Sequence, residues 1–164
     1  MTAQTSTAMG IIDATVDPQV GHLATPISGS AVARTYIQNL PAYREGLSPF
    51  SRGLEIGVAH GYWFYGPFAL LGPLRDSAIA AEAGVISAVA FVFILTVAMS
   101  IYGISNPGAP GATVTNPNPP AELGTREGWS TLASGFLIGG ASGAFFAFLL
   151  NQTPIITDFF TGAL

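Results

Sequence analysis

The feature that most constrains the fold is an apolar run at residues 83–104, which carries no charged side chain. A run of about 22 residues is long enough for a helix to cross the hydrocarbon core of a bilayer. Two further predominantly apolar runs lie at residues 49–71 and 129–150. Only 9% of the residues are charged, which is too few for an ordinary soluble surface. The sequence therefore predicts an all-α membrane protein with three transmembrane helices, at about 49–71, 78–104 and 129–150.

Two polar positions indicate where the first two spans begin. Ser48 precedes Pro49, and this pair is a helix-start signal because the hydroxyl can cap open amides and proline needs no amide partner at the first helical position. Asp76 or Ser77 could cap the second span in the same way. The sequence thus predicts side-chain caps at both helix starts.

Residues 1–47 differ from the rest of the chain because they are mixed, polar and rich in proline, serine, threonine and glycine. They predict an irregular N-terminal extramembrane segment with a short helix at residues 30–39. His22 lies in this solvated context and is expected to be a surface residue. No basic leader with a long apolar core begins the chain, so we expect it to insert through its own first span.

The membrane domain is expected to cover residues 48–164, with a turn-rich loop at 105–127 and a short apolar tail at 151–164. Three spans place the two termini on opposite sides of the membrane. Arg75 alone would lie on the side of the C-terminus. By the positive-inside rule the N-terminus and the long loop are expected in the cytoplasm-equivalent space and the C-terminus on the opposite side. The arginines on the N-terminal side are Arg34, Arg44, Arg52 and Arg126.

Small residues recur at every fourth position of the third span, at Gly135, Gly139, Gly143 and Ala147. Such a stripe lets two helix backbones approach closely in a membrane. The spacing predicts a tight helix–helix contact along this face.

Glu55 and His60 are ionisable side chains inside the first span, where an unpaired charge is costly. Five residues of helix separate them by roughly 140° and about 7.5 Å of rise, so one metal ion cannot bind both. Small neighbours around His60 leave room for a broad, flat ligand such as a tetrapyrrole, with the imidazole as axial ligand. Two other interpretations stay open: Glu55 could pair with Arg52, and His60 could hydrogen-bond a neighbouring helix.

Several classes of protein do not fit this composition. The net charge is −4 and no basic patch alternates with aromatic residues, so we expect no nucleic-acid partner. The chain contains no cysteine, which excludes disulfides and iron–sulfur ligation by this chain. No nucleophile–base pair, phosphate-binding loop or metal-ligand cluster is visible. We therefore expect a non-catalytic protein.

Several long runs of the sequence resemble one known family over residues 21–150. They are RGLEIGVAHGYW, LGPLRDS and LASGFLIGGASGAFFAFLL in the predicted spans, and HLATPISGS and NLPAYREGLSPF before them. In these runs the chain resembles photosystem I reaction centre subunit XI of cyanobacterial type. Such a resemblance implies a three-helix subunit of the thylakoid membrane that contacts the large core subunits and the small membrane subunits of photosystem I.

The resemblance also implies a function and the residues that serve it. Members of the family bind antenna chlorophyll and contact carotenoid (beta-carotene), and they join photosystem I monomers through the same subunit in neighbouring monomers. The chlorophyll ligands map onto Glu55 and His60. Neutral imidazole and carboxylate oxygen are both ligands that the central magnesium accepts.

A calcium site at the oligomer interface is a further implication of the resemblance. It maps onto the side chain of Asp76 and the backbone carbonyl of Pro73. Oxygen ligands suit calcium, but one carboxylate is far below a full coordination shell. Neighbouring subunits would have to supply the other ligands.

Two alternatives come from other classes of membrane protein. A haem-binding anchor subunit of an electron-transfer complex would need a second membrane histidine for bis-imidazole ligation, and His60 is the only histidine in a predicted span. A small transporter would need polar groups at mid-membrane in more than one helix. The haem anchor is kept as the alternative, and the transporter is rejected.

Overall fold

The computed structural model describes residues 25–154. This part divides into two compact units, one formed by residues 25–45 with 111–120 and the other by residues 46–110 with 121–154. His22 and most of the predicted tail lie outside the described residues. The smaller unit thus includes part of the long loop, at residues 111–120.

The smaller unit contains one helix, α1 (Ala31–Asn39). The side chain of Ser30 caps it by accepting a hydrogen bond from the amide of Ala33 at 3.2 Å. The helix confirms the short element predicted at residues 30–39. In the same unit the side chain of Asn118 donates to Glu45 over 3.1 Å, which joins the loop to the residues that follow α1.

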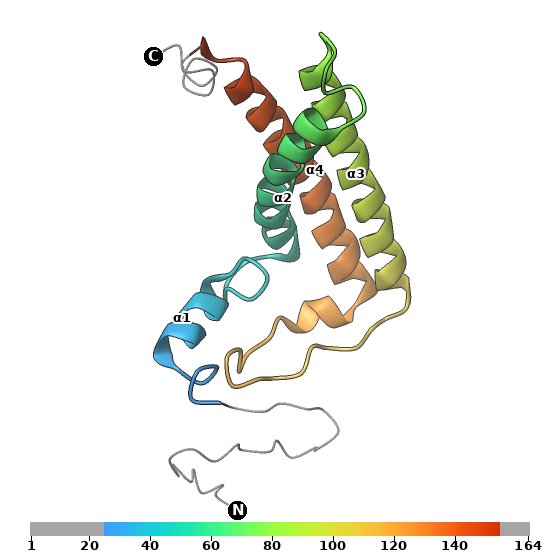
Figure 1. Cartoon of the computed structure of the whole chain (residues 1–164). Coiled ribbons are helices and arrows are strands. Elements are labelled where there is room, and N and C mark those ends of the chain that lie inside the picture. Colours follow the sequence, from blue (N-terminus) through green and yellow to red (C-terminus); the bar gives the residue numbers. More distant parts are fainter. Residues whose placement is uncertain (1–24, 155–164) are drawn as a thin grey trace, which may run out of the picture. The chain divides into compact units, whose positions relative to one another are not determined.

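The larger unit contains three long helices, and Figure 1 shows them packed as a bundle. They are α2 (Pro49–Leu71), α3 (Ala80–Ile104) and α4 (Arg126–Asn151), with a short 3-10 helix, η1 (Ala121–Gly124), before α4. No strand occurs among residues 25–154. The prediction of an all-α protein is confirmed for the described part of the chain.

The starts of α2 and α4 are capped as sequence chemistry requires. Ser48 accepts from the amide of Ser51 at 3.2 Å, with Pro49 at the first helical position, as predicted. Thr125 accepts from the amide of Gly128 at 3.0 Å, so α4 begins three residues earlier than the predicted start at residue 129. Trp129 therefore lies inside the helix, three residues after its first residue, Arg126.

The predicted cap of α3 is wrong. The helix begins at Ala80, and the residue before it, Ile79, makes no side-chain capping bond. The Ser77 hydroxyl instead donates to the carbonyl of Leu74 at 2.7 Å, inside the turn that joins α2 to α3. The Asp76 carboxylate lies 3.5 Å from the Arg75 guanidinium. Both candidate caps are thus used within the turn and do not reach the first amides of the helix.

Two helices of the described part, α3 and α4, are long and apolar enough to cross a membrane. Helix α2 has 23 residues, as predicted, but its polar side chains, Glu55 and His60 among them, make it less apolar than these two. Two of the three predicted spans, α3 and α4, therefore have the length and composition of membrane helices. The first predicted span, α2, stays a prediction.

Helices α2 and α4 run parallel, with their backbones in direct contact through glycines. Gly53, Gly57 and Gly61 of α2 face the main chain of α4 at successive turns. From the other side, Gly135, Gly139 and Gly143 of α4 face the main chain of α2. The predicted close contact along the third span is confirmed, and its partner is α2. The glycines of α2 that form the other half of this contact were not predicted from the sequence.

Helix α3 lies antiparallel to the other two and completes the bundle. Near one end Gly84 packs on Ala69 of α2, and near the other end Gly103 packs on Trp129 of α4. Val92, midway along α3, is fully buried against Gly140. Only about a fifth of the most apolar stretch of α3 is buried (22%), compared with half (50%) of the corresponding stretch of α4. Most of the surface of α3 therefore remains apolar and open.

Candidate functional site

His60 lies on the exposed side of α2, at mid-helix, with its imidazole held by the main chain. Its Nδ1 atom is 2.7 Å from the carbonyl oxygen of Ile56, one turn earlier. A carbonyl can only accept a hydrogen bond, so Nδ1 donates; a neutral imidazole with its proton on Nδ1 has its lone pair on Nε2. A hydrogen bond of this kind is how metal-ligating histidines are commonly oriented. His60 is thus an exposed histidine whose Nδ1 is already bonded within the helix, which leaves Nε2 as the ring nitrogen for a ligand.

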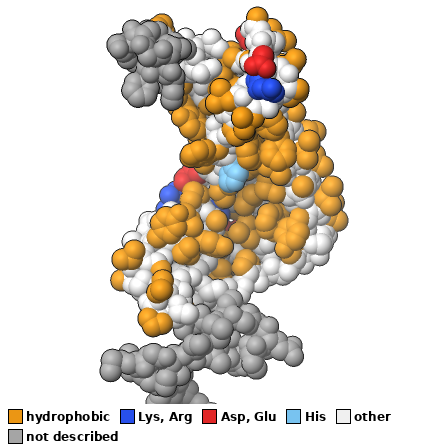
Figure 2. Space-filling view, in the orientation of Figure 1, with side chains coloured by type: hydrophobic (Ala, Val, Ile, Leu, Met, Phe, Trp, Pro, Cys, Tyr) orange, Lys and Arg blue, Asp and Glu red, His pale blue; other side chains and the backbone are white. Residues whose placement is uncertain are grey.

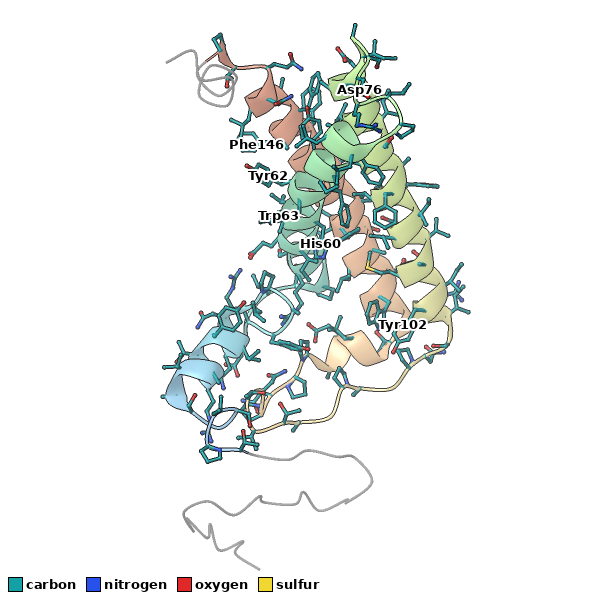
Figure 3. The ribbon with its side chains drawn as sticks, viewed as in Figure 1. His60, Tyr62, Trp63, Asp76, Tyr102 and Phe146 are labelled. Atoms are coloured by element: carbon teal, nitrogen blue, oxygen red, sulfur yellow. The ribbon has the colours of Figure 1, made fainter. Side chains whose placement is uncertain are left out.

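A shallow apolar pocket of about 480 Å³ adjoins this imidazole, between α2 and the ends of α3 and α4. In Figure 3 His60 and Tyr102 come from different helices of the bundle. Besides His60, the pocket is lined by Ile56, Leu95, Met99, Tyr102 and Trp129. A ligand bound to His60 would thus lie against apolar side chains of three helices.

Aromatic side chains surround His60. The ring centroids of His60 and Phe64 are 5.7 Å apart in an edge arrangement, and Phe136 of α4 lies at the same centroid distance in a tilted one. Figure 2 shows the one histidine of the described residues, in pale blue, amid a largely hydrophobic surface. Such surroundings hold the imidazole in place and lower the local polarity, both of which favour metal ligation by a neutral ring.

The glycines around His60 do not serve the role that the sequence analysis gave them. Gly57 and Gly61 are buried against α4, where an added Cβ would overlap the main chain of Phe136 or Gly140. They leave no room for a flat ligand because α4 occupies it. The open space beside His60 is instead lined by side chains of α3 and α4.

Glu55 is half-buried on the same helix, five residues before His60. The continuous helix keeps the two side chains about 140° apart, so the structure does not bring them together at one ion. The alternative partner Arg52 is buried, and its Nε atom lies 3.5 Å from the carboxylate of Glu122 in η1. Sequence reasoning did not identify Glu122 because it lies 70 residues further along the chain.

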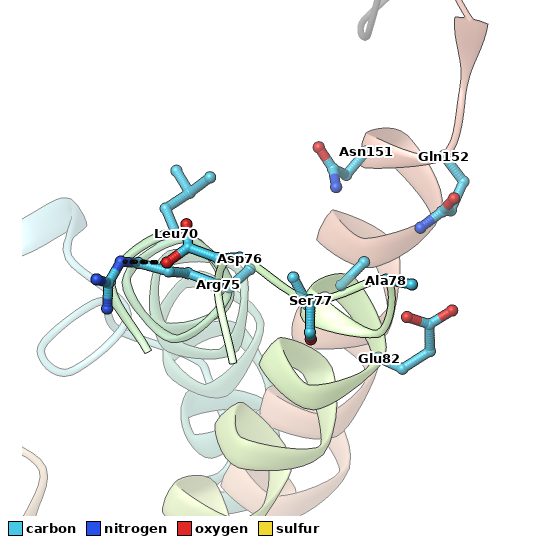
Figure 4. A pocket seen from close by; sticks show the side chains of 11 residues that line it. Leu70, Arg75, Asp76, Ser77, Ala78, Glu82, Asn151 and Gln152 are labelled. Carbon is cyan, nitrogen blue, oxygen red and sulfur yellow. Dashed lines mark ion pairs between the residues drawn. The ribbon is translucent and has the colours of Figure 1, made fainter. Parts of the chain in front are cut away.

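Asp76 lies in the turn between α2 and α3, with its side chain 86% exposed. It lines a pocket of about 440 Å³ together with Glu82 of α3 and the amides Asn151 and Gln152 at the end of α4. In Figure 4 the Asp76 carboxylate points toward Arg75, and Glu82 lies well apart from it. Pro73, whose carbonyl was the second predicted ligand, is exposed in the same turn.

The described residues hold no group of three or more histidine, aspartate or glutamate side chains that could bind a metal ion together. Asp76 and Pro73 could therefore supply only part of a calcium shell. The exposure of both residues leaves them accessible to ligands from another chain.

The matching family model covers residues 10–155 and describes photosystem I reaction centre subunit XI. The relatives with this name include proteins of Synechococcus elongatus (56% identical over 141 residues, 85% of each chain) and Crocosphaera subtropica (53% over 144 residues, 88% of this chain and 92% of the relative). The relative in Mastigocladus laminosus is 50% identical over 147 residues, 89% of this chain and 85% of its own.

These matches cover the predicted spans together with the segment before them, as the resemblance in the sequence indicated. They give no support to the alternative of a haem-binding anchor subunit. The chain therefore belongs to the family of photosystem I reaction centre subunit XI, a non-catalytic subunit of that complex.

Proposed function

We propose that this chain binds antenna chlorophyll and carotenoid in the thylakoid membrane and joins photosystem I monomers into oligomers. The observation that carries the pigment proposal is the hydrogen bonding and exposure of His60. Its Nδ1 is engaged by the carbonyl of Ile56 at 2.7 Å, and the ring lies exposed beside an apolar pocket. Nε2 would bind the central magnesium of a chlorophyll, which would supply light absorption and excitation transfer.

Glu55 is the second proposed chlorophyll ligand. Its carboxylate is half-buried on α2, about 140° around the helix from His60. Two chlorophylls bound at these positions would lie on different faces of α2. A carboxylate oxygen suits magnesium, and its charge offsets that of the metal.

A carotenoid would be accommodated along α2 and α4, where exposed aromatic side chains lie in a second, largely apolar pocket. It is lined by Tyr62, Trp63 and Leu70 of α2 and by Leu150 of α4, among others. Figure 3 shows Tyr62, Trp63 and Phe146 on this part of the bundle. The rings of Tyr62 and Phe146 are 6.5 Å apart. A long polyene can pack against such a surface through dispersion contacts without needing a polar partner.

The proposal includes three membrane spans, so that α2 crosses the membrane in addition to α3 and α4. Helix α2 runs parallel to α4 in a fixed register, since Gly53 faces Leu132 and Gly61 faces Gly140. Its 23 residues would extend about 34 Å along the helix axis. If α4 crosses the bilayer, α2 in this register would lie at the same depth, which supports its assignment as a membrane span. The arginine distribution favours a stromal N-terminus and a lumenal C-terminus.

The oligomer proposal includes a calcium ion held by Asp76 and the carbonyl of Pro73 with ligands from a neighbouring chain. The exposure of this turn supports it, because an interface residue must be accessible in the separate subunit. The apolar tail after residue 150 is the second proposed contact. Deleting it should reduce the oligomer fraction, measured by native size, more than the yield of monomers. Equal loss of both would argue against a specific role of the tail.

The pigment proposal is tested with photosystem I purified from cells whose own subunit carries His60→Leu. One chlorophyll per complex should be lost, measured by pigment extraction against the amount of this subunit. Insertion should be unaffected because the change removes a polar group from the membrane. Phe93→Leu is the matched control, since it changes an exposed ring on α3 outside this pocket and leaves the imidazole and its contacts. An unchanged pigment count in His60→Leu would refute ligation by this residue.

A further inference from the structure

The pocket beside His60 contains few polar side-chain atoms, and most of them have protein partners. Trp129 donates its indole N–H to the carbonyl of Leu123 at 2.5 Å. His60 Nδ1 donates to Ile56. The other polar lining residue is Tyr102 in the last turn of α3, and its hydroxyl makes no hydrogen bond to residues 25–154. Nε2 of His60 and the Tyr102 hydroxyl are therefore the two polar groups that a ligand in this pocket could bind.

We infer that the Tyr102 hydroxyl is a positioning group for the chlorophyll that the proposed function assigns to His60, and that it donates a hydrogen bond to a carbonyl at the edge of the ring. The inference rests on that proposed function. Chlorophyll carries keto and ester carbonyls on its periphery, and each is a hydrogen-bond acceptor. An axial ligand alone leaves the ring free to rotate about the metal–nitrogen bond. A second polar contact at the edge would fix that rotation.

The placement of Tyr102 supports this role. Side chains on a helix lean toward its N-terminus, which for Tyr102 is the direction of Met99 and Leu95 along the same pocket. Since α3 is antiparallel to α2, this direction leads from the end of α3 toward the depth of His60. The Tyr102 ring is held by Trp129 in an edge contact with centroids 4.8 Å apart. The ring is thus fixed, and its hydroxyl remains accessible, since the residue is 51% exposed.

The simpler role of Tyr102 is that of an interfacial tyrosine whose hydroxyl contacts water or lipid headgroups. The two roles differ in one measurable respect. Only a hydrogen bond to the pigment lowers the stretching frequency of a chlorophyll carbonyl and shifts the absorption band of that chlorophyll.

The test compares purified photosystem I complexes that carry Tyr102→Phe, His60→Leu or the control Tyr36→Phe, which removes the hydroxyl of an exposed tyrosine on α1, outside both proposed pigment pockets. Low-temperature absorption and resonance Raman difference spectra are recorded at equal content of this subunit. In Tyr102→Phe we expect an unchanged chlorophyll count, one carbonyl band moved to higher frequency, and a derivative-shaped absorption difference. His60→Leu should lose the same pigment outright, and Tyr36→Phe should move no carbonyl band.

The possible outcomes separate the inference from the function on which it rests. If His60→Leu loses a chlorophyll and Tyr102→Phe leaves every carbonyl band in place, the positioning role is refuted while ligation by His60 stands. If His60→Leu retains all chlorophyll, the proposed function fails and the inference fails with it. A carbonyl shift that also appears in Tyr36→Phe would likewise overturn the assignment, because it would not be specific to this pocket.

Discussion

Gly139 of α4 packs directly on the main chain of Leu54 in α2, so closely that an added Cβ would overlap the carbonyl oxygen of Leu54. The contact repeats one turn away in each direction, at Gly135 and Gly143. Only glycine permits this separation of the two helix backbones. The same contact fixes the register of α2, and with it the height of His60 relative to the pocket formed by α3 and α4.

Gly139→Leu should therefore force α2 and α4 apart. Overpacking of this kind costs typically 1–3 kcal/mol, and here the obstacle is backbone that cannot rotate away. The expected result is release of the subunit from photosystem I at a lower temperature, followed by immunodetection after heating. Ile138→Leu is the matched control because its side chain is exposed on the same helix. Equal release temperatures for the two variants would show that the close contact is unimportant.

The ion pair between Arg52 and Glu122 should stabilise the attachment of η1 to α2. The Arg52 side chain is buried and Glu122 is about one-third exposed, so we expect a coupling energy of about 1 kcal/mol, at the upper end for exposed pairs. The measurement is a double-mutant cycle with Arg52→Met and Glu122→Gln on unfolding free energies in detergent micelles. The exposed pair Arg75 and Asp76 is the control and should couple close to zero. Similar coupling in both pairs would contradict the expectation.

Tyr65 and Asn151 join α2 to the end of α4 by a hydrogen bond of 2.9 Å between the Asn151 amide and the Tyr65 hydroxyl. Tyr65 is buried, and polar contacts between membrane helices contribute about 0.6 kcal/mol on average. Tyr65→Phe should therefore lower the unfolding free energy by roughly that amount. Tyr62→Phe should leave it unchanged, since that residue is exposed. A larger loss in the control would mean that the buried hydroxyl has no special role.

Asp76 should make oligomer stability depend on calcium, if the ion joins this turn to a neighbouring chain. Chelation of calcium should shift wild-type oligomers toward monomers in native size analysis, and added calcium should restore them. Asp76→Asn should remove this response, since the carboxylate supplies the charge that calcium prefers. Glu82→Gln, a change in the same pocket, is the control. A chelator response that persists in Asp76→Asn would exclude this residue as a ligand.

The elements were predictable because their signals are local. Residues 49–71 form α2 within the predicted bounds, since Ser48 and Pro49 fix its start by local chemistry. The cap of α3 was wrongly predicted for the complementary reason. Ser77 has the right chemistry, but the turn before α3 uses its hydroxyl at the carbonyl of Leu74.

Of the candidate site, only the two ionisable residues on the first predicted span could be identified from the sequence. Glu55 and His60 are conspicuous in an apolar run, so the sequence alone identified them as the groups to explain, and their roles as ligands remain proposals. The pocket was not predictable, because Tyr102 and Trp129 join His60 from helices far along the chain. No local spacing connects these three residues.

By itself, the sequence determined the helices, the polar residues within the first predicted span and the glycine stripe of the third, because each depends on neighbours within a few turns. Only the tertiary structure decided which helix meets that stripe and what faces the imidazole. Both follow from the register of α2 against α4, which is set when Gly57 and Gly139 allow the two backbones to touch. The glycines beside His60 were predicted to leave room for a ligand, whereas they pack against α4, and the pocket beside His60 is lined by other residues.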